Sequence, residues 1–564
     1  MIGVIARDNQ RAVVEEFFQL FKTPWEFWRE GSEYSTIIIT CRTDDVPSAA
    51  LVILYCSETT PYDIRTGIRP ISCESRELLE NEKFIFPVYA GLSIFKIKEI
   101  PLLHIKAKGL CAGYMREQKG QRICRIGYDL FDEIAYVLTK GQPLEFATIP
   151  TIEIHIAFLK RCILDAGIPI IDIPPVPYGY HFMVCLTHDV DFIRMKDHGI
   201  DHSVIGFLLR SLLRPSLRDS QSKIRWSRLL RNWKAVLMMP FAYAGVVRDP
   251  WYDIDCYQKI EKDIPSTFFF VPRKDYTGKA ADKKLTKPMS YRSIRYDVKD
   301  YAPELKKLAH EGREIALHGI DAWRDAKSAS TERDVIRGIT GDNVAGVRMH
   351  WLYFADCSPE AIGKSGLFYD SSLGYNDAAG FRSGTTQVFC LDGHGNVYEL
   401  PLNIMDTALF SRDRMGLSEY HAMQACRKVI ECFRISGGVL TINWHTRSLR
   451  PERNWDGFYC ELIQMLKAER AWFAVAKLAV EWFRRRRTLN FSNVSFREGV
   501  AQVTLMNNDV NWADLPPMQI RVHIPASATG SRAVESEPCI MSVPWHGESH
   551  IEIKLWKTTE NIHA

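Results

Sequence analysis

Two carboxylates lie two residues apart at the end of an apolar run, in the segment Leu186-Thr187-His188-Asp189-Val190-Asp191. Side chains two apart on a strand point to the same face, so Asp189 and Asp191 could converge on one metal ion or one water molecule. The alternative is a surface loop that carries two solvated acids. A convergent pair would suit metal binding and proton transfer.

Four further segments place a polar or reactive residue directly after a short apolar or β-rich run. They lead to His318-Gly319-Ile320-Asp321, to Arg348-Met349-His350-Trp351, to Tyr369-Asp370-Ser371-Ser372 and to His445. Helix-like stretches separate them, and α/β folds build sites in this way at the carboxyl ends of parallel strands. The sequence therefore predicts an α/β fold whose strands bring these residues together.

The order and kind of these motifs resemble the polysaccharide deacetylase family, also called NodB-like or carbohydrate esterase family 4. Members carry an acidic pair, a His-x-x-x-His segment, an Arg-x-Pro-aromatic segment, an Asp-Ser/Ala-Ser/Thr segment and a late Leu-x-His. The motifs Thr-His-Asp-Val-Asp and His-Gly-x-Asp-Ala-Trp are similar to those of a bacterial branch with an N-terminal accessory domain. The resemblance covers residues 181 to 485. It implies an irregular (β/α) barrel that removes N-acetyl groups from amino sugars.

The resemblance also implies a role for each residue of the site. Asp189 would be the catalytic base and Asp191 a metal ligand. His318 would be a second ligand, His445 the general acid, and Arg348 the partner that orients Asp189. The residue types fit this chemistry, because a divalent ion activates water and polarises a carbonyl while an acid and a base transfer protons. Zinc is the expected ion, although cobalt, nickel or manganese would accept the same mixed ligands.

The sequence departs from the family pattern at the second histidine, which would fall at Ala322. The third ligand must come from elsewhere, or the site holds no metal. Asp321 is one candidate, because residues three apart are neighbours on a helical turn and it could join His318. His350 is the other, since it occupies the proline position of the Arg-x-Pro-aromatic motif. Asp321 could instead cap a helix running from Ala322, and His350 could be a core histidine.

Three assignments near the site rest on weaker patterns. Asp370-Ser371-Ser372 could line the site or support Arg348, or form an ordinary turn. Asp406 follows a strand-like segment, and we assign it to packing. His188 is expected to be structural and to face away from Asp189 if the strand alternates regularly.

Two other functions are compatible with the sequence. A degenerate deacetylase domain could bind glycan or act as a scaffold. The missing second histidine favours this hypothesis, whereas the joint presence of an acid, a base and an orienting arginine argues against it. The same chemistry would also allow a deformylase that acts on an N-acyl sugar.

The composition is that of an ordinary globular protein, with 46% hydrophobic and 25% charged residues and a net charge of +4. That charge gives no reason to expect a nucleic-acid partner. The segment Met1 to Asp8 reaches a charge before a signal-like apolar core, and the fourteen cysteines form no Cys-x-x-Cys pair. We therefore expect a cytoplasmic protein.

Three domains are expected along the chain. We expect residues 1–172 to form an N-terminal α/β accessory domain and residues 181–487 to form the deacetylase-like domain. Residues 488–564 should form a small β domain, because their apolar residues alternate with period two. A Pro-rich stretch at 173–179 marks the first boundary. The run Arg484 to Arg487 ends a predicted helix, where cations suit the helix dipole.

The catalytic region carries a basic insertion at about 200–250, because 126 residues separate Asp191 from His318, about twice what the family pattern needs. Its cations lie among apolar residues and are Arg210, Arg214, Arg218, Lys223, Arg225, Arg228, Arg231 and Lys234. This composition suits an amphipathic helix on an anionic membrane surface, whereas the alternative is a helical insertion packed on the core. The expected partner is an N-acetylated glycan or a glycolipid precursor, the latter at the inner face of a membrane.

Overall fold

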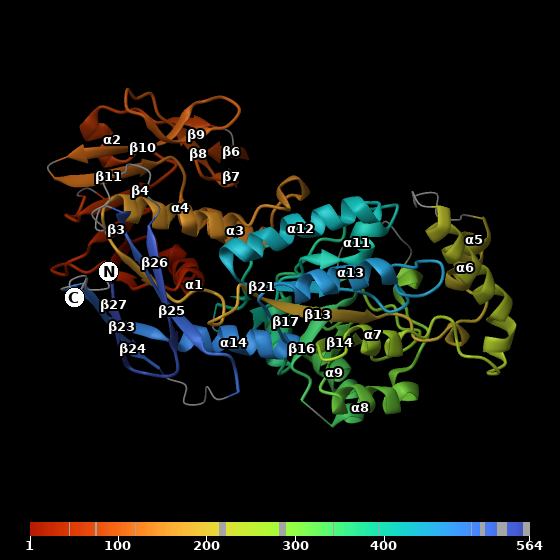
Figure 1. Cartoon of the computed structure of the whole chain (residues 1–564). Coiled ribbons are helices and arrows are strands. Elements are labelled where there is room, and N and C mark those ends of the chain that lie inside the picture. The colour runs from red at the N-terminus through yellow and green to blue at the C-terminus, as the bar shows by residue number, and fades with distance from the viewer. Residues whose placement is uncertain are drawn as a thin grey trace, which may run out of the picture. The chain divides into compact units, whose positions relative to one another are not determined.

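The structure is a computed structural model that describes residues 1–555 except 44–45, 74–75, 119, 214–221, 281–288, 342, 394, 498, 508–513 and 527–537. The chain forms two compact units (Figure 1). One consists of Met1–Tyr178, Ser383–Thr385 and the segment from Trp482 onward, and the other of Gly179–Arg382 and Thr386–Glu481.

The second unit is built on a mostly parallel sheet that contains the strands expected to carry the site. The strand order is β18-β19-β17-β16-β15-β14-β13-β21-β20, with β22 also paired to β13 and β18 the antiparallel member. The bounds are β13 (Phe182–Val190), β14 (Ser266–Phe270), β15 (Glu314–Gly319), β16 (Gly346–Met349), β17 (Tyr369–Asp370), β18 (Phe389–Cys390), β19 (Tyr398–Glu399), β20 (Ile404–Met405), β21 (Val439–Asn443) and β22 (Ala471–Phe473).

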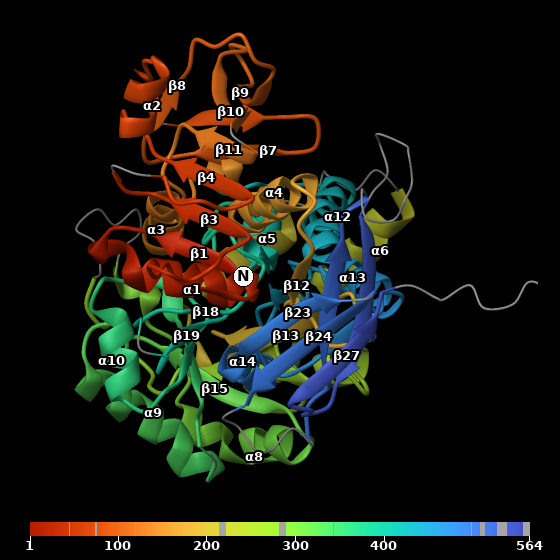
Figure 2. The ribbon, with the colours of Figure 1, turned by 90° about the vertical axis from the view of Figure 1, so that its left-hand side faces the viewer.

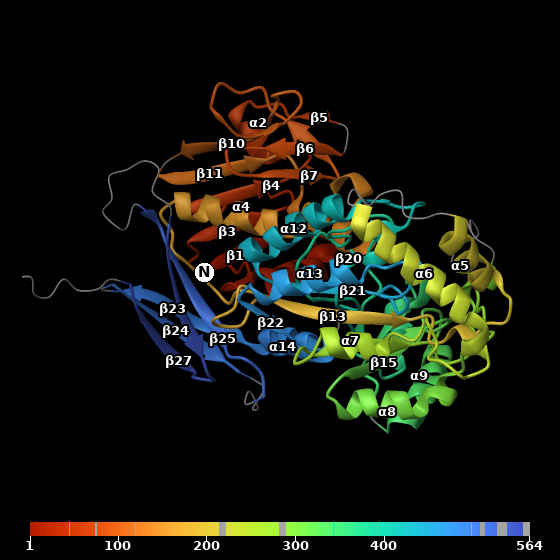
Figure 3. The same cartoon turned by 45° about the vertical axis from the view of Figure 1, so that its right-hand side comes forward.

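The central strands are buried along their whole length. Every residue of β13, β14 and β21 is buried, as expected for near-continuous apolar runs in a parallel sheet covered on both faces. Helices follow most strands, as Figure 3 shows, with bounds α7 (Ile254–Ile260), α8 (Ala302–His310), α9 (Ala326–Thr340), α10 (Ser358–Lys364), α11 (Asp406–Phe410), α12 (Glu419–Ser436), α13 (Asp456–Lys467) and α14 (Ala476–Thr488). The expected α/β class is confirmed.

The sheet is open and curled within the described part of the chain, since its hydrogen-bonded order begins at β18 and ends at β20. The complete irregular barrel that the resemblance implies stays a prediction. Because parallel strands run the same way, the ends of β13, β15, β16 and β21 meet at one edge of this sheet.

The basic insertion forms two helices, α5 (His202–Leu213) and α6 (Ser222–Tyr243). One face of this pair packs on the core: Val204, Phe207 and Ala235 form a buried cluster with Met195 and Trp251. Arg214 and Arg218 lie outside the described residues, as do the side chains of Lys223 and Arg225.

The first unit contains a nine-stranded sheet of order β2-β1-β3-β4-β11-β10-β9-β6-β7 (Figure 2). Its strands are β1 (Ile2–Ile5), β2 (Trp25–Phe27), β3 (Thr36–Ile39), β4 (Leu51–Tyr55), β6 (Glu77–Glu80), β7 (Ile85–Val88), β9 (Pro101–Ile105), β10 (Cys111–Gln118) and β11 (Gln121–Ile126), and β5 (Ile71–Cys73) pairs with β8 (Leu92–Ile94). The accompanying helices are α1 (Arg11–Phe21), α2 (Pro61–Thr66), α3 (Leu130–Lys140) and α4 (Thr151–Asp165).

The C-terminal strands belong to the same unit. β12 (Ile170–Asp172) pairs with β25 (Met518–Ile524), which pairs with β26 (Cys539–Trp545), and a second sheet joins β23 (Asn490–Arg497), β24 (Val500–Met506) and β27 (His550–Lys554). Arg486, from the arginine run, is buried here and donates hydrogen bonds to the carbonyls of Gln19, Leu20 and Ile173. The three-domain division itself stays a prediction.

Among the described helices, none combines the length and the apolar character needed to cross a membrane.

Candidate active site

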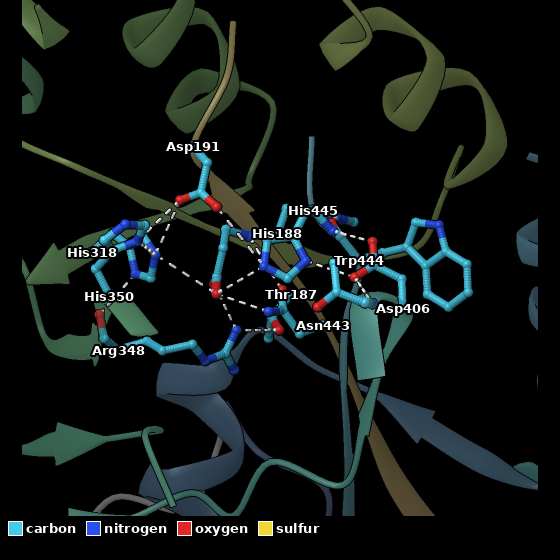
Figure 4. Close-up of polar contacts among 12 residues, drawn as sticks. Thr187, His188, Asp191, His318, Arg348, His350, Asp406, Asn443, Trp444 and His445 are labelled. Atoms are coloured by element: carbon cyan, nitrogen blue, oxygen red, sulfur yellow. Dashed lines mark hydrogen bonds and ion pairs between the residues drawn. The ribbon is translucent and has the colours of Figure 1, made fainter. Parts of the chain in front are cut away.

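The residues singled out in the sequence lie around one cavity at the carboxyl ends of the strands. The cavity has a volume of about 870 Å³, and Asp189, Asp191, His318, His350 and His445 line it. Arg348 is fully buried beneath it. Figure 4 shows the imidazoles of His318 and His350 on one side of Asp191 and His445 on the other.

Asp191, His318 and His350 form a group that could hold a metal ion, because one ligand atom of each lies within 4.8 Å of the others. Asp191 Oδ1 is 3.4 Å from His318 Nε2 and 3.2 Å from His350 Nδ1, and these two nitrogens are 3.1 Å apart. One carboxylate oxygen facing two imidazole nitrogens matches the mixed oxygen and nitrogen ligands that zinc accepts. The donor set therefore fits a divalent ion.

The two histidines are set up as ligands by their surroundings. His318 Nδ1 donates a hydrogen bond to the carbonyl oxygen of Arg348 at 2.9 Å, which leaves Nε2 as the ring nitrogen available to a metal ion. Burial lowers the pKa of His350 and outweighs the opposite effect of Asp191. A neutral imidazole is the form that binds metal.

Asp321 lies outside this group. Its carboxylate accepts hydrogen bonds from Tyr276 Oη at 2.7 Å and from the backbone N–H of Lys279 at 2.8 Å. Asp321 could reach the His318 side only if this segment were helical, but His318 lies in strand β15, where the chain is extended. Asp321 does not cap the next helix either, since α9 begins at Ala326 with Asp325 as its N-cap.

Asp189 is held by two neighbours. Its Oδ1 accepts a hydrogen bond from Arg348 Nη1 at 2.9 Å, and its Oδ2 accepts one from Asn443 Nδ2 at 2.8 Å. Burial would raise the pKa of Asp189, but His318, Arg348 and His445 together bring it below its ordinary value. Asp189 is therefore ionised at neutral pH, as a proton acceptor must be.

Arg348 is locked in place by a network that includes the Asp-Ser-Ser segment. It donates to Thr187 Oγ1 at 2.8 Å, to the carbonyl of Ser371 at 2.9 Å and to Ser371 Oγ at 2.9 Å. Ser372 Oγ accepts from the backbone N–H of Met349 at 2.8 Å. These contacts favour the interpretation in which Asp370-Ser371-Ser372 supports Arg348.

His445 is paired with a residue that the sequence analysis assigned to packing. Asp406 Oδ1 lies 2.6 Å from His445 Nδ1, and Asp406 Oδ2 accepts from the backbone N–H of His445 at 2.8 Å and from Ser448 Oγ at 2.5 Å. Burial lowers the pKa of His445, but Asp406 and the acid pair outweigh it and raise that pKa. The packing assignment of Asp406 is wrong. One feature of the sequence could have revealed this role: Asp406 directly follows strand β20, just as the other site residues stand at the ends of their strands.

The opposite Nε2 atom of His445 faces the acid pair, at 3.9 Å from both Asp189 Oδ2 and Asp191 Oδ2. His188 faces away from the site, as expected: its Nδ1 donates to the carbonyl of Trp444 at 2.8 Å, and its Nε2 lies 2.9 Å from Glu261. The candidate site thus combines a group of metal-ligand type, to which Asp191 belongs, with the ionised carboxylate of Asp189 and a protonatable histidine, His445.

The fold and this site define an α/β protein with carboxylates, histidines and one arginine gathered at the ends of parallel strands. No protein-family model matches the chain. A stretch of 103 residues, 17% of this chain, is 28% identical to a peptidoglycan deacetylase of Helicobacter pylori and covers 35% of that protein. The chain therefore spans about a third of the length of this curated relative.

Solved structures give a fold-level comparison. A protein of Mycobacterium smegmatis assigned to the polysaccharide deacetylases is 19% identical, with 55% of this chain and 94% of that chain covered and a TM-score of 0.32. The Puue allantoinase is 13% identical, with 56% and 92% covered and a TM-score of 0.32. The similarity to deacetylases that the motif order indicates is confirmed by the peptidoglycan deacetylase, at 28% identity over 17% of the chain.

Proposed function

We propose that this protein is a metal-dependent hydrolase that removes N-acetyl groups from the amino sugars of a polysaccharide or a glycolipid precursor. The observation that carries the proposal is that Asp189 and Asp191 both lie 3.9 Å from His445 Nε2, with Arg348 orienting Asp189 and Asp406 orienting the histidine. Similarity to a peptidoglycan deacetylase supports the same class of reaction.

Asp191, His318 and His350 would hold the metal ion, with zinc as the first choice and cobalt, nickel or manganese as alternatives. When bound there, such an ion supplies Lewis-acid polarisation of the acetamide carbonyl and lowers the pKa of water. With His350 in this position, the alanine at 322 no longer favours a degenerate, merely glycan-binding or scaffolding domain.

The remaining residues would move the protons. Asp189, kept ionised by Arg348 and Asn443, takes a proton from the attacking water as that water adds to the carbonyl carbon. His445 gives a proton from Nε2 to the departing amine as the carbon–nitrogen bond breaks, while Asp406 holds its Nδ1 proton. The products are acetate and a free amino sugar.

Release of acetate from an N-acetylglucosamine oligomer by the zinc-loaded protein tests this proposal. Asp189→Asn should abolish release while retaining the metal, because the base is lost and the three ligands are unchanged. Activity that survives Asp189→Asn would contradict the assignment of the base. Release of formate from an N-formyl sugar, with no acetate from the N-acetyl oligomer, would instead establish the deformylase alternative.

We further propose a cytoplasmic location, with access to glycolipid precursors at the inner face of a membrane. The cysteine usage favours it, since the fourteen cysteines form no Cys-x-x-Cys pair.

A further inference from the structure

Helix α6 has two apolar faces, and only one of them is covered. Leu229 and Ala235 are buried against the core, as are the neighbouring Asn232 and Ala242. The other stripe repeats every three or four residues, as one face of a helix must, and stays exposed: Trp226 59%, Leu230 60%, Trp233 40%, Leu237 71% and Phe241 50%. Folding of the described chain therefore leaves a row of large apolar side chains in solvent.

Helix α5, which lies beside α6 (Figures 1 and 3), also carries exposed apolar side chains. Ile205, Leu209 and Leu212, at helical spacing, are about half exposed. Of the 28 large apolar side chains that are exposed among the described residues, twelve lie between Ile200 and Val246. Scattered exposed apolar residues are ordinary, but a concentration of this kind marks an interaction surface. We call the exposed side of α5 and α6 the apolar face.

The helices that carry the apolar face are fixed to the body of their unit. Arg231 pairs with Asp456 at 2.8 Å, Arg228 pairs with Glu419 at 2.5 Å, and Arg210 pairs with Glu452. Asn232 Oδ1 also accepts from the backbone N–H of Glu452 at 2.7 Å. These contacts leave the apolar face turned outward on a rigid support.

The charge of the same segment identifies what would cover this face. Residues 202–248 contain nine lysines and arginines but a single acid, Asp219. Four of these cations, Arg210, Arg228, Arg231 and Arg248, pair with acids outside the segment. The cations that remain to attract an anionic surface are Arg214, Arg218, Lys223, Arg225 and Lys234. A helix with tryptophan, leucine and phenylalanine on one side and lysine and arginine around it is the pattern of an interfacial helix on anionic lipid. Tryptophan is favoured at the level of the headgroups.

The segment also borders the candidate active site. His198, Asp201, His202 and Ser203 line the cavity that holds the acid pair. The ring of His202 stacks on Tyr291 with centroids 4.3 Å apart, and Tyr243 Oη, at the end of α6, donates to the carbonyl of His198 at 2.8 Å. The apolar face and the rim of the cavity thus belong to one connected structure.

We propose that the apolar face of α5 and α6 docks on an anionic phospholipid bilayer, so that the cavity acts on sugars whose lipid carrier resides in that bilayer. The second half of this inference rests on the proposed deacetylase function, whereas the docking itself does not. Docking would place the cavity next to a lipid-linked substrate at high local concentration. A protein without such a face would have to meet the same substrate by diffusion from solution.

Co-sedimentation of the full-length protein with vesicles tests docking directly. We expect binding to vesicles of phosphatidylcholine mixed with phosphatidylglycerol, weaker binding to phosphatidylcholine alone, and loss of binding at high salt. The double variant Leu230→Glu/Leu237→Glu should reduce the partition coefficient by about tenfold or more, since it places two anions in the apolar face. The matched control is Ile100→Glu/Ile435→Glu, which alters two residues that are 90% and 77% exposed elsewhere.

Two further readouts separate docking from catalysis. Leu230→Glu/Leu237→Glu should leave acetate release from a soluble oligomer unchanged, which shows that the variant is folded, whereas Asp189→Asn should still bind vesicles. Absence of vesicle binding by the wild-type protein would overturn the proposal. So would a wild-type dimer, measured by sedimentation velocity, that Leu230→Glu/Leu237→Glu converts to a monomer, because the apolar face would then be covered by a second copy of the chain.

Discussion

Asp406 Oδ1 and His445 Nδ1 lie 2.6 Å apart, and this pair joins the end of β20 to the end of β21. The carboxylate fixes which nitrogen of His445 carries a proton and raises its pKa against the opposing effect of burial. The Nε2 atom that faces the acid pair can therefore stay protonated to higher pH than in an ordinary histidine.

Asp406→Asn should lower the rate of acetate release by about 100-fold, the lower end of what a general acid contributes. Loss of the carboxylate lowers the pKa of His445, so the alkaline limb of the pH profile should move to lower pH. The measurement is acetate release by the zinc-loaded enzyme across pH. Ser448→Ala, which removes another partner of Asp406 but keeps the carboxylate, is the control and should move this limb little. An unshifted limb in Asp406→Asn would exclude His445 as the titrating acid.

Asn443→Asp should move the acidic limb of the same profile to higher pH. Asn443 Nδ2 donates to Asp189 Oδ2 at 2.8 Å, and a carboxylate in its place puts a like charge beside the base. Like charges raise the pKa of a carboxyl group, so Asp189 would lose its proton only at higher pH. Bound zinc measured in parallel should remain unchanged, since Asn443 is not in the ligand group. An acidic limb that stays in place would assign that limb to another residue.

Metal content separates the two candidates for the third ligand. After zinc loading and desalting, elemental analysis should find about one ion per chain in the wild-type protein and far less in Asp191→Ala and His350→Ala. Asp321→Ala is the matched control and should keep its zinc, because Asp321 bonds to Tyr276 and Lys279 rather than to the group. Zinc retained in His350→Ala and lost in Asp321→Ala would reverse the proposed assignment.

The site residues that stand at the ends of the longer strands could be predicted from the sequence. The acid pair, His318, Arg348 and His445 each follow an apolar run, and such runs are recognisable because parallel strands bury both faces. The same rule would have included Asp406, but β20 has only two residues, Ile404 and Met405, too short to stand out as a strand.

The choice between Asp321 and His350 could not be made from spacing. It depends on whether the chain at His318 is helical or extended, and β15 continues to Gly319, so residues three apart are not neighbours there. The contacts of Arg348 with Ser371 and of Asp189 with Asn443 join strands that are neighbours in the sheet but far apart in the sequence, β16 with the end of β17 and β13 with β21. Such contacts depend on strand order, which one sequence does not contain.

Arg486→Ala should destabilise the unit that contains it by about 3 kcal/mol, because the carbonyls of Gln19, Leu20 and Ile173, the last two buried, lose a charged donor. Burial lowers the pKa of Arg486 to about 9, opposed by Asp172, so the side chain is still charged at neutral pH. Calorimetry at neutral pH is the measurement. Arg484→Ala, an exposed member of the same run, is the control and should change stability by less than about 1 kcal/mol. Equal losses in both variants would refute a special role for Arg486.

Gly346, at the start of β16, lies against the ring of Tyr369 on the neighbouring strand. A Cβ atom at Gly346 would come within 1.9 to 2.2 Å of three ring carbons, so the ring or the strand must move. The ring has little freedom, because Tyr369 is fully buried and its hydroxyl donates to Glu314 at 2.8 Å. The displacement should reach Arg348, two residues along β16, which orients Asp189.

Gly346→Ala should therefore lower both the stability, by about 3 kcal/mol, and the rate of acetate release. Gly338→Ala is the matched control, since Gly338 lies in α9 with no atom within 4 Å of the added Cβ; it should stabilise by about 0.5 to 1 kcal/mol and leave the rate unchanged. Gly346→Ala/Tyr369→Leu should recover part of both losses because the smaller side chain makes room for the methyl group. A Gly346→Ala enzyme with wild-type rate and reduced stability would show that the strain does not reach Arg348.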